Sequence, residues 1–116
     1  MGLPTLILDF DGVIHSYTSG WQGIDVTPDP PVEGVKSAIN ELKKHFRVVV
    51  YSSRCHQEGG IEAIRKYLLK HDIWVDAIVD KKVPVVAMVD DRGITFTGEW
   101  SEEFVEQIKH FKAWYE

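Results

Sequence analysis

TLILDFDGVIH, the stretch from Thr5 to His15, decides the fold: it is a short apolar run ending in two aspartates with one residue between them. The apolar part is typical of a buried strand in a parallel sheet, and open α/β sheets bind their ligands at the carboxyl ends of such strands. Because side chains alternate along a strand, Asp9 and Asp11 would point the same way if the strand continued through both. Gly12 then frees the backbone to turn sharply. Two carboxylates at a strand end suit a hard cation such as Mg²⁺, or a nucleophile beside a proton donor.

Length and composition predict a single domain spanning residues 1–116, because the chain can bury one core and is too short for a second. The net charge of −5 is mild and argues against broad nucleic-acid binding, which normally needs a basic face. No apolar stretch approaches the ~20 residues of a membrane span, and the N-terminus lacks a signal-peptide pattern. The single cysteine, Cys55, excludes an internal disulfide and fits a reducing compartment. We therefore expect a cytoplasmic protein without membrane association.

Strand-like and helix-like patterns alternate along the rest of the chain. The expected strands cover residues 6–10, 47–52, 74–79, 85–89 and 94–97. One helix is expected to start at Asp29, with Pro30 in its first turn, and to reach Phe46; a second begins near residues 59–60. Ser101 is expected to cap a third helix, whose apolar stripe extends to residue 115. The alternation predicts an α/β fold, a doubly wound three-layer sandwich with a mainly parallel central sheet.

Polar residues that could carry chemistry follow the predicted strands. Ser52 ends the second strand, Asp90 and Asp91 end the fourth, and Lys81 and Lys82 precede the fourth. Such a set can transfer a phosphoryl group: a carboxylate attacks phosphorus, a cation and a lysine neutralise the phosphoryl oxygens, and a hydroxyl donates a hydrogen bond. Clustered carboxylates repel one another unless a positive charge balances them, so the cluster itself implies a cation.

Four motifs in this order resemble those of the haloacid dehalogenase superfamily: DFDG at 9–12, VVVYSSR at 48–54, a lysine, and MVDDR at 88–92. The second aspartate of the first motif indicates the phosphatase branch. The resemblance implies that Asp9 is a nucleophile forming an aspartyl-phosphate, and that Asp11 acts as general acid and then as general base. It also implies that Ser52 and a lysine bind the phosphoryl group. We favour Lys82, which is nearer to the strand and to a proline, and Lys81 is the alternative.

The same resemblance implies a magnesium ion at this edge of the sheet. Its ligands would be the Asp9 carboxylate, the Asp11 backbone carbonyl and Asp90, with Asp91 in direct or water-mediated support. The expected cofactor is therefore Mg²⁺.

Family members often carry a substrate-selecting cap domain, and neither place for one, between residues 11 and 52 or between 52 and 82, has room here. The chain therefore resembles a capless member. An open site suits a macromolecular end, such as a phosphoprotein or a nucleic-acid terminus, or a nucleotide or sugar phosphate covered by a second subunit of a homo-oligomer. Arg54, directly after two serines, resembles the second motif of polynucleotide 3′-phosphatase domains.

Three further residues could contact substrate, and each has a purely structural alternative. His15 and Trp21 lie in the loop 12–31, where family members have a mobile flap, and both could instead pack internally. Arg54 could bind a substrate anion or pair with a local carboxylate.

The sequence thus predicts a hydrolase, a Mg²⁺-dependent phosphomonoester phosphatase. Two alternatives stay open: a receiver-like signalling domain, and a phosphate- or metal-binding module without turnover. In receiver domains an adjacent acidic pair follows the first strand and the phosphorylated aspartate follows the third. Here the adjacent pair, Asp90 and Asp91, comes last, so the order fits poorly.

Overall fold

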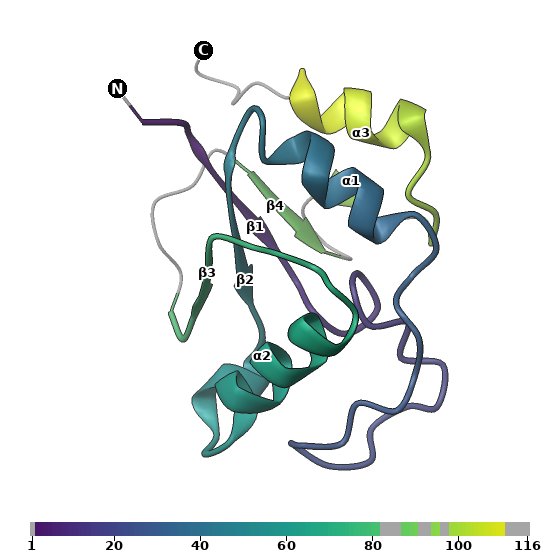
Figure 1. Ribbon diagram of the computed structural model, residues 1–116, viewed down its shortest axis with the longest axis vertical. Coiled ribbons are helices and arrows are strands. Elements are labelled where there is room, and N and C mark those ends of the chain that lie inside the picture. Colours follow the sequence, from purple (N-terminus) through teal and green to yellow (C-terminus); the bar gives the residue numbers. More distant parts are fainter. Residues whose placement is uncertain (1, 82–86, 91–93, 96–97, 111–116) are drawn as a thin grey trace.

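A parallel sheet forms the centre of the protein (Figure 1). The computed structural model describes residues 2–81, 87–90, 94–95 and 98–110, with only the backbone of residues 87, 90, 94 and 95. The sheet order within these residues is β3-β2-β1-β4-β5, and every neighbouring pair is parallel. The strands are β1 Thr5–Leu8, β2 Arg47–Tyr51, β3 Ala77–Val79, β4 Ala87–Asp90 and β5 Ile94–Thr95.

Helices connect the first three strands, and one more helix follows the last strand of the described residues. They are α1 Val35–Leu42, the short 3₁₀ helix η1 Ser53–His56, α2 Gly60–Lys70 and α3 Glu102–Lys109. Within the continuous stretch 2–81, only a loop and α1 separate β1 from β2, and only η1 and α2 separate β2 from β3. The predicted parallel α/β fold without a cap is therefore confirmed.

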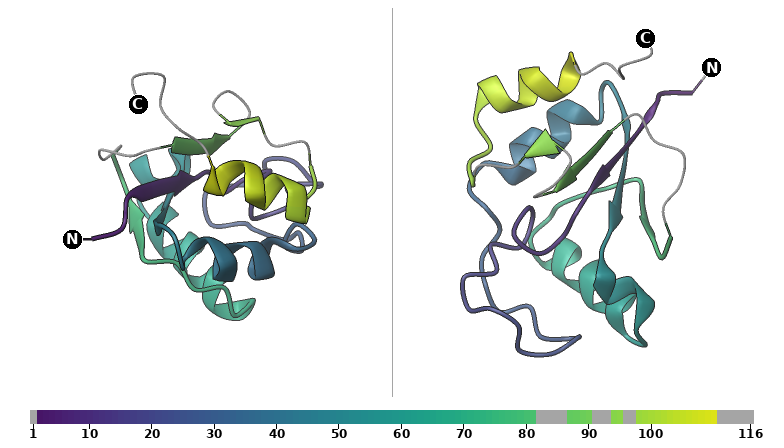
Figure 2. Two further views of the ribbon diagram at one scale, coloured as in Figure 1. Left: turned by 90° about the horizontal axis from the view of Figure 1, so that it is seen from above. Right: turned by 180° about the vertical axis from the view of Figure 1, so that it is seen from behind.

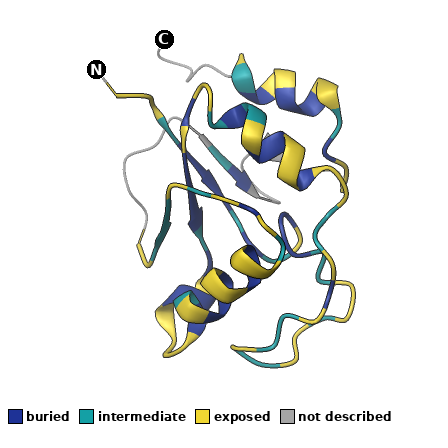
Figure 3. Cartoon of the chain, in the orientation of Figure 1, coloured by how far each residue is buried: buried dark blue, intermediate teal, exposed yellow. Residues whose placement is uncertain are grey.

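Apolar side chains cover both faces of the central strands, as expected of a parallel sheet. Leu6 and Leu8 of β1 belong to one core cluster, to which α1, α2 and α3 all contribute side chains. Ile7 and Val49 alternate to the opposite face and are only 1% and 0% exposed. The central strands β1 and β2 are correspondingly dark blue along most of their length, whereas β3 is only partly buried (Figure 3). Burying each such side chain stabilises the fold by roughly 1.5–3 kcal/mol.

The first helix begins later than the sequence pattern predicts. It starts at Val35, with Gly34 as its N-cap, and not at Asp29. The prediction of an Asp29 cap is wrong because tertiary pairing holds this segment extended: the Val32 N–H donates to the Ile14 carbonyl at 2.8 Å. The helix also ends at Leu42, short of residue 46.

The last helix confirms its predicted start. The Ser101 hydroxyl oxygen accepts a hydrogen bond from the Phe104 N–H at 3.1 Å, as an N-cap serine should. The helix ends at Lys109, and the predicted continuation through residues 111–115 lies outside the described residues.

Candidate active site

The carboxyl ends of β1 and β2 place Asp9 and Ser52 at one edge of the sheet. Leu8 of β1 is paired with Val50 of β2 and with Val89 of β4, so the chain that follows β1 lies beside the carboxyl ends of β2 and β4. The Asp9 N–H donates to the Val89 carbonyl at 3.1 Å, which places the backbone of Asp90 beside that of Asp9. In Figures 1 and 2 the loop after β1, coloured purple to blue, lies beyond these strand ends.

A tight turn after β1 folds the chain back onto the strand end. The Phe10 carbonyl accepts hydrogen bonds from the Ile14 and His15 N–H groups at 2.9 and 3.0 Å. Gly12 lies in the turn with φ of +84°, a left-handed conformation that glycine adopts without a steric penalty. The predicted sharp turn at Gly12 is therefore confirmed, and it returns His15 to a position beside Asp11.

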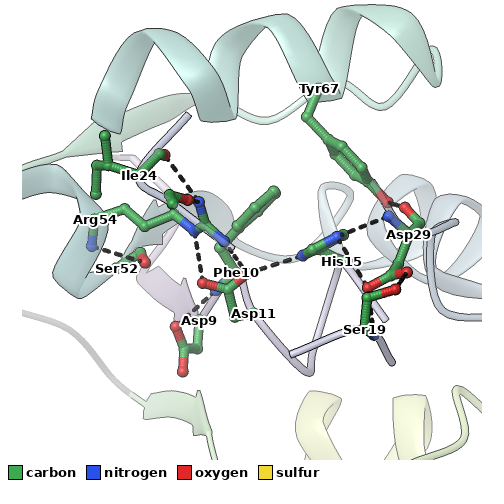
Figure 4. A network of polar contacts seen from close by, with 11 residues as sticks. Asp9, Phe10, Asp11, His15, Ser19, Ile24, Asp29, Ser52, Arg54 and Tyr67 are labelled. Atoms are coloured by element: carbon green, nitrogen blue, oxygen red, sulfur yellow. Dashed lines mark hydrogen bonds and ion pairs between the residues drawn. The ribbon is translucent and has the colours of Figure 1, made fainter. Parts of the chain in front are cut away.

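Asp11 is held by two side chains from opposite directions (Figure 4). The Arg54 Nε donates to Asp11 Oδ2 at 2.7 Å, and Arg54 Nη2 donates to Asp11 Oδ1 at 3.1 Å. His15 Nδ1 lies 2.9 Å from the same Oδ1. A forked, charge-assisted pair of this kind fixes direction as well as distance. The orientation of the Asp11 carboxylate is consequently determined by residues 43 positions away and 4 positions away in the sequence.

Arg54 also fastens the loop 12–31 over the site. Its side chain is only 1% exposed, and its Nη1 donates to the carbonyls of Gly23 and Ile24 at 3.0 and 2.8 Å. The guanidinium carbon lies 4.7 Å from the centre of a Trp21 ring, within the range of a cation–π contact. Four of the five guanidinium N–H groups are thereby engaged. The structure shows pairing with a local carboxylate, and contact of Arg54 with a substrate anion stays a prediction.

Gly60 permits the close packing that positions Arg54. A Cβ atom on Gly60 would lie 1.7 Å from the Arg54 carbonyl oxygen, a distance at which backbone would have to move. The first turn of α2 therefore rests directly on the backbone of η1. Ser52 caps η1, because its hydroxyl oxygen accepts a hydrogen bond from the Arg54 N–H at 3.2 Å.

His15 is an interior residue, at 0% exposure. Its ring stacks on Phe10, with centroids 5.4 Å apart, and meets the Tyr67 ring edge-on at 5.2 Å. Trp21, by contrast, is 52% exposed. Of the three residues predicted to touch substrate, Trp21 alone presents a large surface to solvent. Direct contact of His15 with substrate stays a prediction, and its observed partners are internal.

Asp29 is the site residue that sequence reasoning missed. It is 7% exposed, and its carboxylate accepts hydrogen bonds from the Ser19 hydroxyl and from the Ser19 N–H. The hydrogen bond from the Ser19 side chain is the main reason that the pKa of Asp29 lies below its usual value. Tyr67 donates its hydroxyl hydrogen to the Asp29 carbonyl at 2.9 Å, and burial raises the pKa of this phenol. The Asp-Pro-Pro sequence at this point is typical of a helix start, so the sequence pattern predicted a helix cap at Asp29 and not a residue of the site.

The lowered pKa of Asp29 predicts a specific dependence of stability on pH. A carboxyl group whose pKa is depressed on folding contributes stability above its unfolded pKa and loses it as pH falls through the folded value. The free-energy difference between wild type and Asp29→Asn should therefore be constant above about pH 4–5 and shrink in more acidic solution. Urea denaturation across this range measures it. Ser19→Ala should weaken the same pH dependence, and a difference that grows on acidification would contradict the assignment.

The predicted magnesium site lies only partly within the described residues. Carboxylate and carbonyl oxygens suit this cation, and Asp9 and Asp11 supply them at the end of β1. The described residues contain no group of three acidic, histidine or cysteine side chains able to hold a metal. Asp91 and the side chain of Asp90 lie outside them, so the ligand set stays a prediction. Lys82 lies outside as well, and Lys81 is exposed.

Comparison with known proteins supports the fold. No family model and no curated protein match the chain. One similar solved structure is that of the Pnkp1/Rnl/Hen1 RNA repair complex, with a TM-score of 0.54 and 17% identity over 96% of this chain and 33% of that chain. A second structure of a Pnkp1/Rnl/Hen1 complex has a TM-score of 0.53 and 18% identity over 97% of this chain and 37% of that chain. The protein thus spans about a third of the length of these neighbours. None of the described helices could span a membrane.

Proposed function

We propose that the protein is a Mg²⁺-dependent phosphomonoester phosphatase that acts through an aspartyl-phosphate on Asp9. The observation that supports it best is the meeting of Asp9, Asp11 and Ser52 at the carboxyl edge of the sheet, with β4 bringing Asp90 alongside. Ligands of open α/β sheets bind at this edge. The resemblance of the four sequence motifs to the haloacid dehalogenase superfamily gives each of these residues its role.

The chemistry follows from the two carboxylates in the turn after β1. An Asp9 oxygen attacks phosphorus, the bond to the leaving oxygen breaks, and Asp11 gives that oxygen a proton. Asp11 then takes a proton from water, whose oxygen attacks phosphorus, and the Asp9 oxygen–phosphorus bond breaks to release inorganic phosphate. Mg²⁺ held by Asp9, the Asp11 carbonyl, Asp90 and Asp91 would neutralise the phosphoryl oxygens. Ser52 and Lys82 would bind the same oxygens.

A nucleic-acid 3′-phosphate is the substrate that we place first. The neighbours in fold come from an RNA repair complex, and the serine–arginine motif at Arg54 resembles that of polynucleotide 3′-phosphatase domains. The absence of a cap leaves an open edge that suits the end of a large molecule. The net charge of −5 limits recognition to that end, because a long electrostatic footprint needs a basic surface.

A phosphate-release assay with Mg²⁺ tests this proposal. We expect release from a 3′-phosphorylated oligonucleotide, loss of release on chelation, and recovery when Mg²⁺ is restored. The same oligonucleotide with a 5′-phosphate is the matched substrate control, and phosphopeptides and sugar phosphates extend the screen. Release that is indifferent to chelation, or no release from any phosphomonoester, would contradict the proposal.

The strand order bears on one of the two alternative functions, the receiver-like signalling domain. Receiver domains share the flavodoxin-like strand order 2-1-3-4-5, in which the third strand lies beside the first. Here the described strands place β4 beside β1 and β3 beside β2, so the fold does not support a receiver. A module that binds phosphate or metal without turnover would retain affinity in the assay above and release nothing.

A further inference from the structure

We infer that His15 is a positioning residue, which holds the Asp11 carboxylate through its Nδ1–H in a tautomer set by the backbone of Asp29. The inference rests on the proposed function in one respect: Asp11 is taken as the acid and base of the reaction. The hydrogen-bond chain itself is a feature of the fold, and it can be measured without any activity.

The tautomer follows from one backbone hydrogen bond. The Asp29 N–H donates to His15 Nε2 at 3.1 Å. A backbone N–H can only donate, so Nε2 accepts this bond and carries no hydrogen; the Asp29 Oδ2 atom, 3.7 Å from Nε2, is the more distant neighbour. A neutral imidazole has a single N–H, which is therefore on Nδ1. Nδ1 lies 2.9 Å from Asp11 Oδ1, so it donates to that oxygen.

The surroundings prevent either partner from turning away. Phe10 and Tyr67 enclose the imidazole, which has no exposed surface. The Tyr67 hydroxyl holds the Asp29 carbonyl, and the Ser16 N–H donates to the Pro30 carbonyl at 3.0 Å. The segments on both sides of the His15–Asp29 contact are thus tied together. A ring flip would exchange each nitrogen with a ring carbon, so that the Asp29 N–H and Asp11 Oδ1 would both face carbon atoms.

His15 gives the Asp11 carboxylate a third hydrogen bond, in addition to the two from Arg54. Arg54 contacts both carboxylate oxygens, and His15 adds a donor to Oδ1 from the opposite side of the site (Figure 4). With these donors in place, Oδ2 faces one donor and Oδ1 faces two. The two oxygens are therefore inequivalent. Loss of His15 should misplace the Asp11 carboxylate in the transition state with little effect on substrate binding.

Nitrogen NMR of the histidine rings tests the tautomer in the wild-type protein. Two-bond correlations between ring protons and nitrogens are recorded well above the ordinary histidine pKa of about 6.5. We expect His15 to show an unprotonated Nε2 and a protonated Nδ1, assigned by the disappearance of its signals in His15→Phe. A protonated Nε2, with Nδ1 either protonated or not, would overturn the inference.

Two substitutions of His15 separate positioning from packing. His15→Phe keeps the aromatic volume and removes both nitrogens, whereas His15→Asn places an amide N–H where Nδ1 was. Both leave the Asp29 N–H without its acceptor, so they differ in the donor to Asp11. For His15→Phe we expect kcat to fall about 10–100-fold, with KM nearly unchanged, as for other residues that orient a reacting group. His15→Asn should recover most of this loss.

Controls make each failure distinct. His45→Asn, at a half-exposed histidine whose partner is Glu41, should leave kcat and KM unchanged. Equal losses of kcat in the folded Phe and Asn variants, or no loss in either, would overturn the positioning role. If the wild type shows no phosphatase activity while NMR finds the Nδ1–H tautomer, the proposed function fails and the tautomer assignment stands.

Discussion

Asp9→Asn is expected to abolish phosphatase turnover, by at least about 10³-fold, in a protein that remains folded. An amide cannot attack phosphorus, and it is a poorer ligand for Mg²⁺ than a carboxylate. The fold should survive because the Asp9 Oδ1 accepts a hydrogen bond from the Phe10 N–H at 2.7 Å, and the amide oxygen of asparagine can accept the same bond.

The measurement compares phosphate release with the thermal unfolding midpoint in wild type and variant. Asp72→Asn is a matched control, since it makes the same chemical change at an exposed residue beyond the end of α2. Asp72 has a φ of +55°, which asparagine also tolerates. Substantial turnover in a folded Asp9→Asn protein would remove the aspartyl-phosphate mechanism.

Local sequence patterns predicted those parts of the fold that depend on local physics. The apolar runs predicted the central strands, because a strand buried on both faces needs apolar residues at every position. The polar residues Asp9 and Ser52 follow those strands, so their meeting at one sheet edge required only the parallel arrangement. The Ser101 cap could also be predicted, because it depends on a hydrogen bond to a residue only three positions along the chain.

Interactions between distant residues could not be predicted in this way. Asp29 precedes a proline, as a helix-capping residue often does. Its contact with His15 depends instead on the turn at Gly12, which folds the chain back after β1. The sequence left two possible partners for Arg54, a substrate anion or a local carboxylate. Which one it meets depends on how closely α2 packs against the backbone of Arg54. Gly60 permits this close packing, because a side chain there would collide with the Arg54 carbonyl. In the sequence, however, Gly59 and Gly60 at a helix start are equally typical of a simple turn.

Breaking the Asp11–Arg54 ion pair should lower the free energy of unfolding far more than breaking an exposed ion pair with the same donor–acceptor distance. Arg54→Met keeps the buried stem and removes the charge, which leaves the carbonyls of Gly23 and Ile24 without this donor and leaves the Asp11 carboxylate without its positive partner. We expect a loss of about 3 kcal/mol, at the low end for broken buried pairs because the Asp11 side chain is 19% exposed. Asp11→Asn should also destabilise, since it leaves a buried guanidinium without its carboxylate. Urea denaturation with a shared slope measures each loss.

The double variant decides whether the pair acts as a unit. Once both charges are gone, neither is left uncompensated, so the double variant should lose about 1–3 kcal/mol less than the two single losses added together. The Arg65–Glu62 pair is the matched control, because it has the same 2.7 Å separation but side chains 58% and 51% exposed. Arg65→Met and Glu62→Gln should each change stability by less than about 1 kcal/mol. Additive losses at Asp11 and Arg54 would show that the carbonyls of the loop, and not the carboxylate, are what Arg54 chiefly holds. Coupled losses would show that the residue proposed to move protons is also the residue on which the loop over the site is fastened.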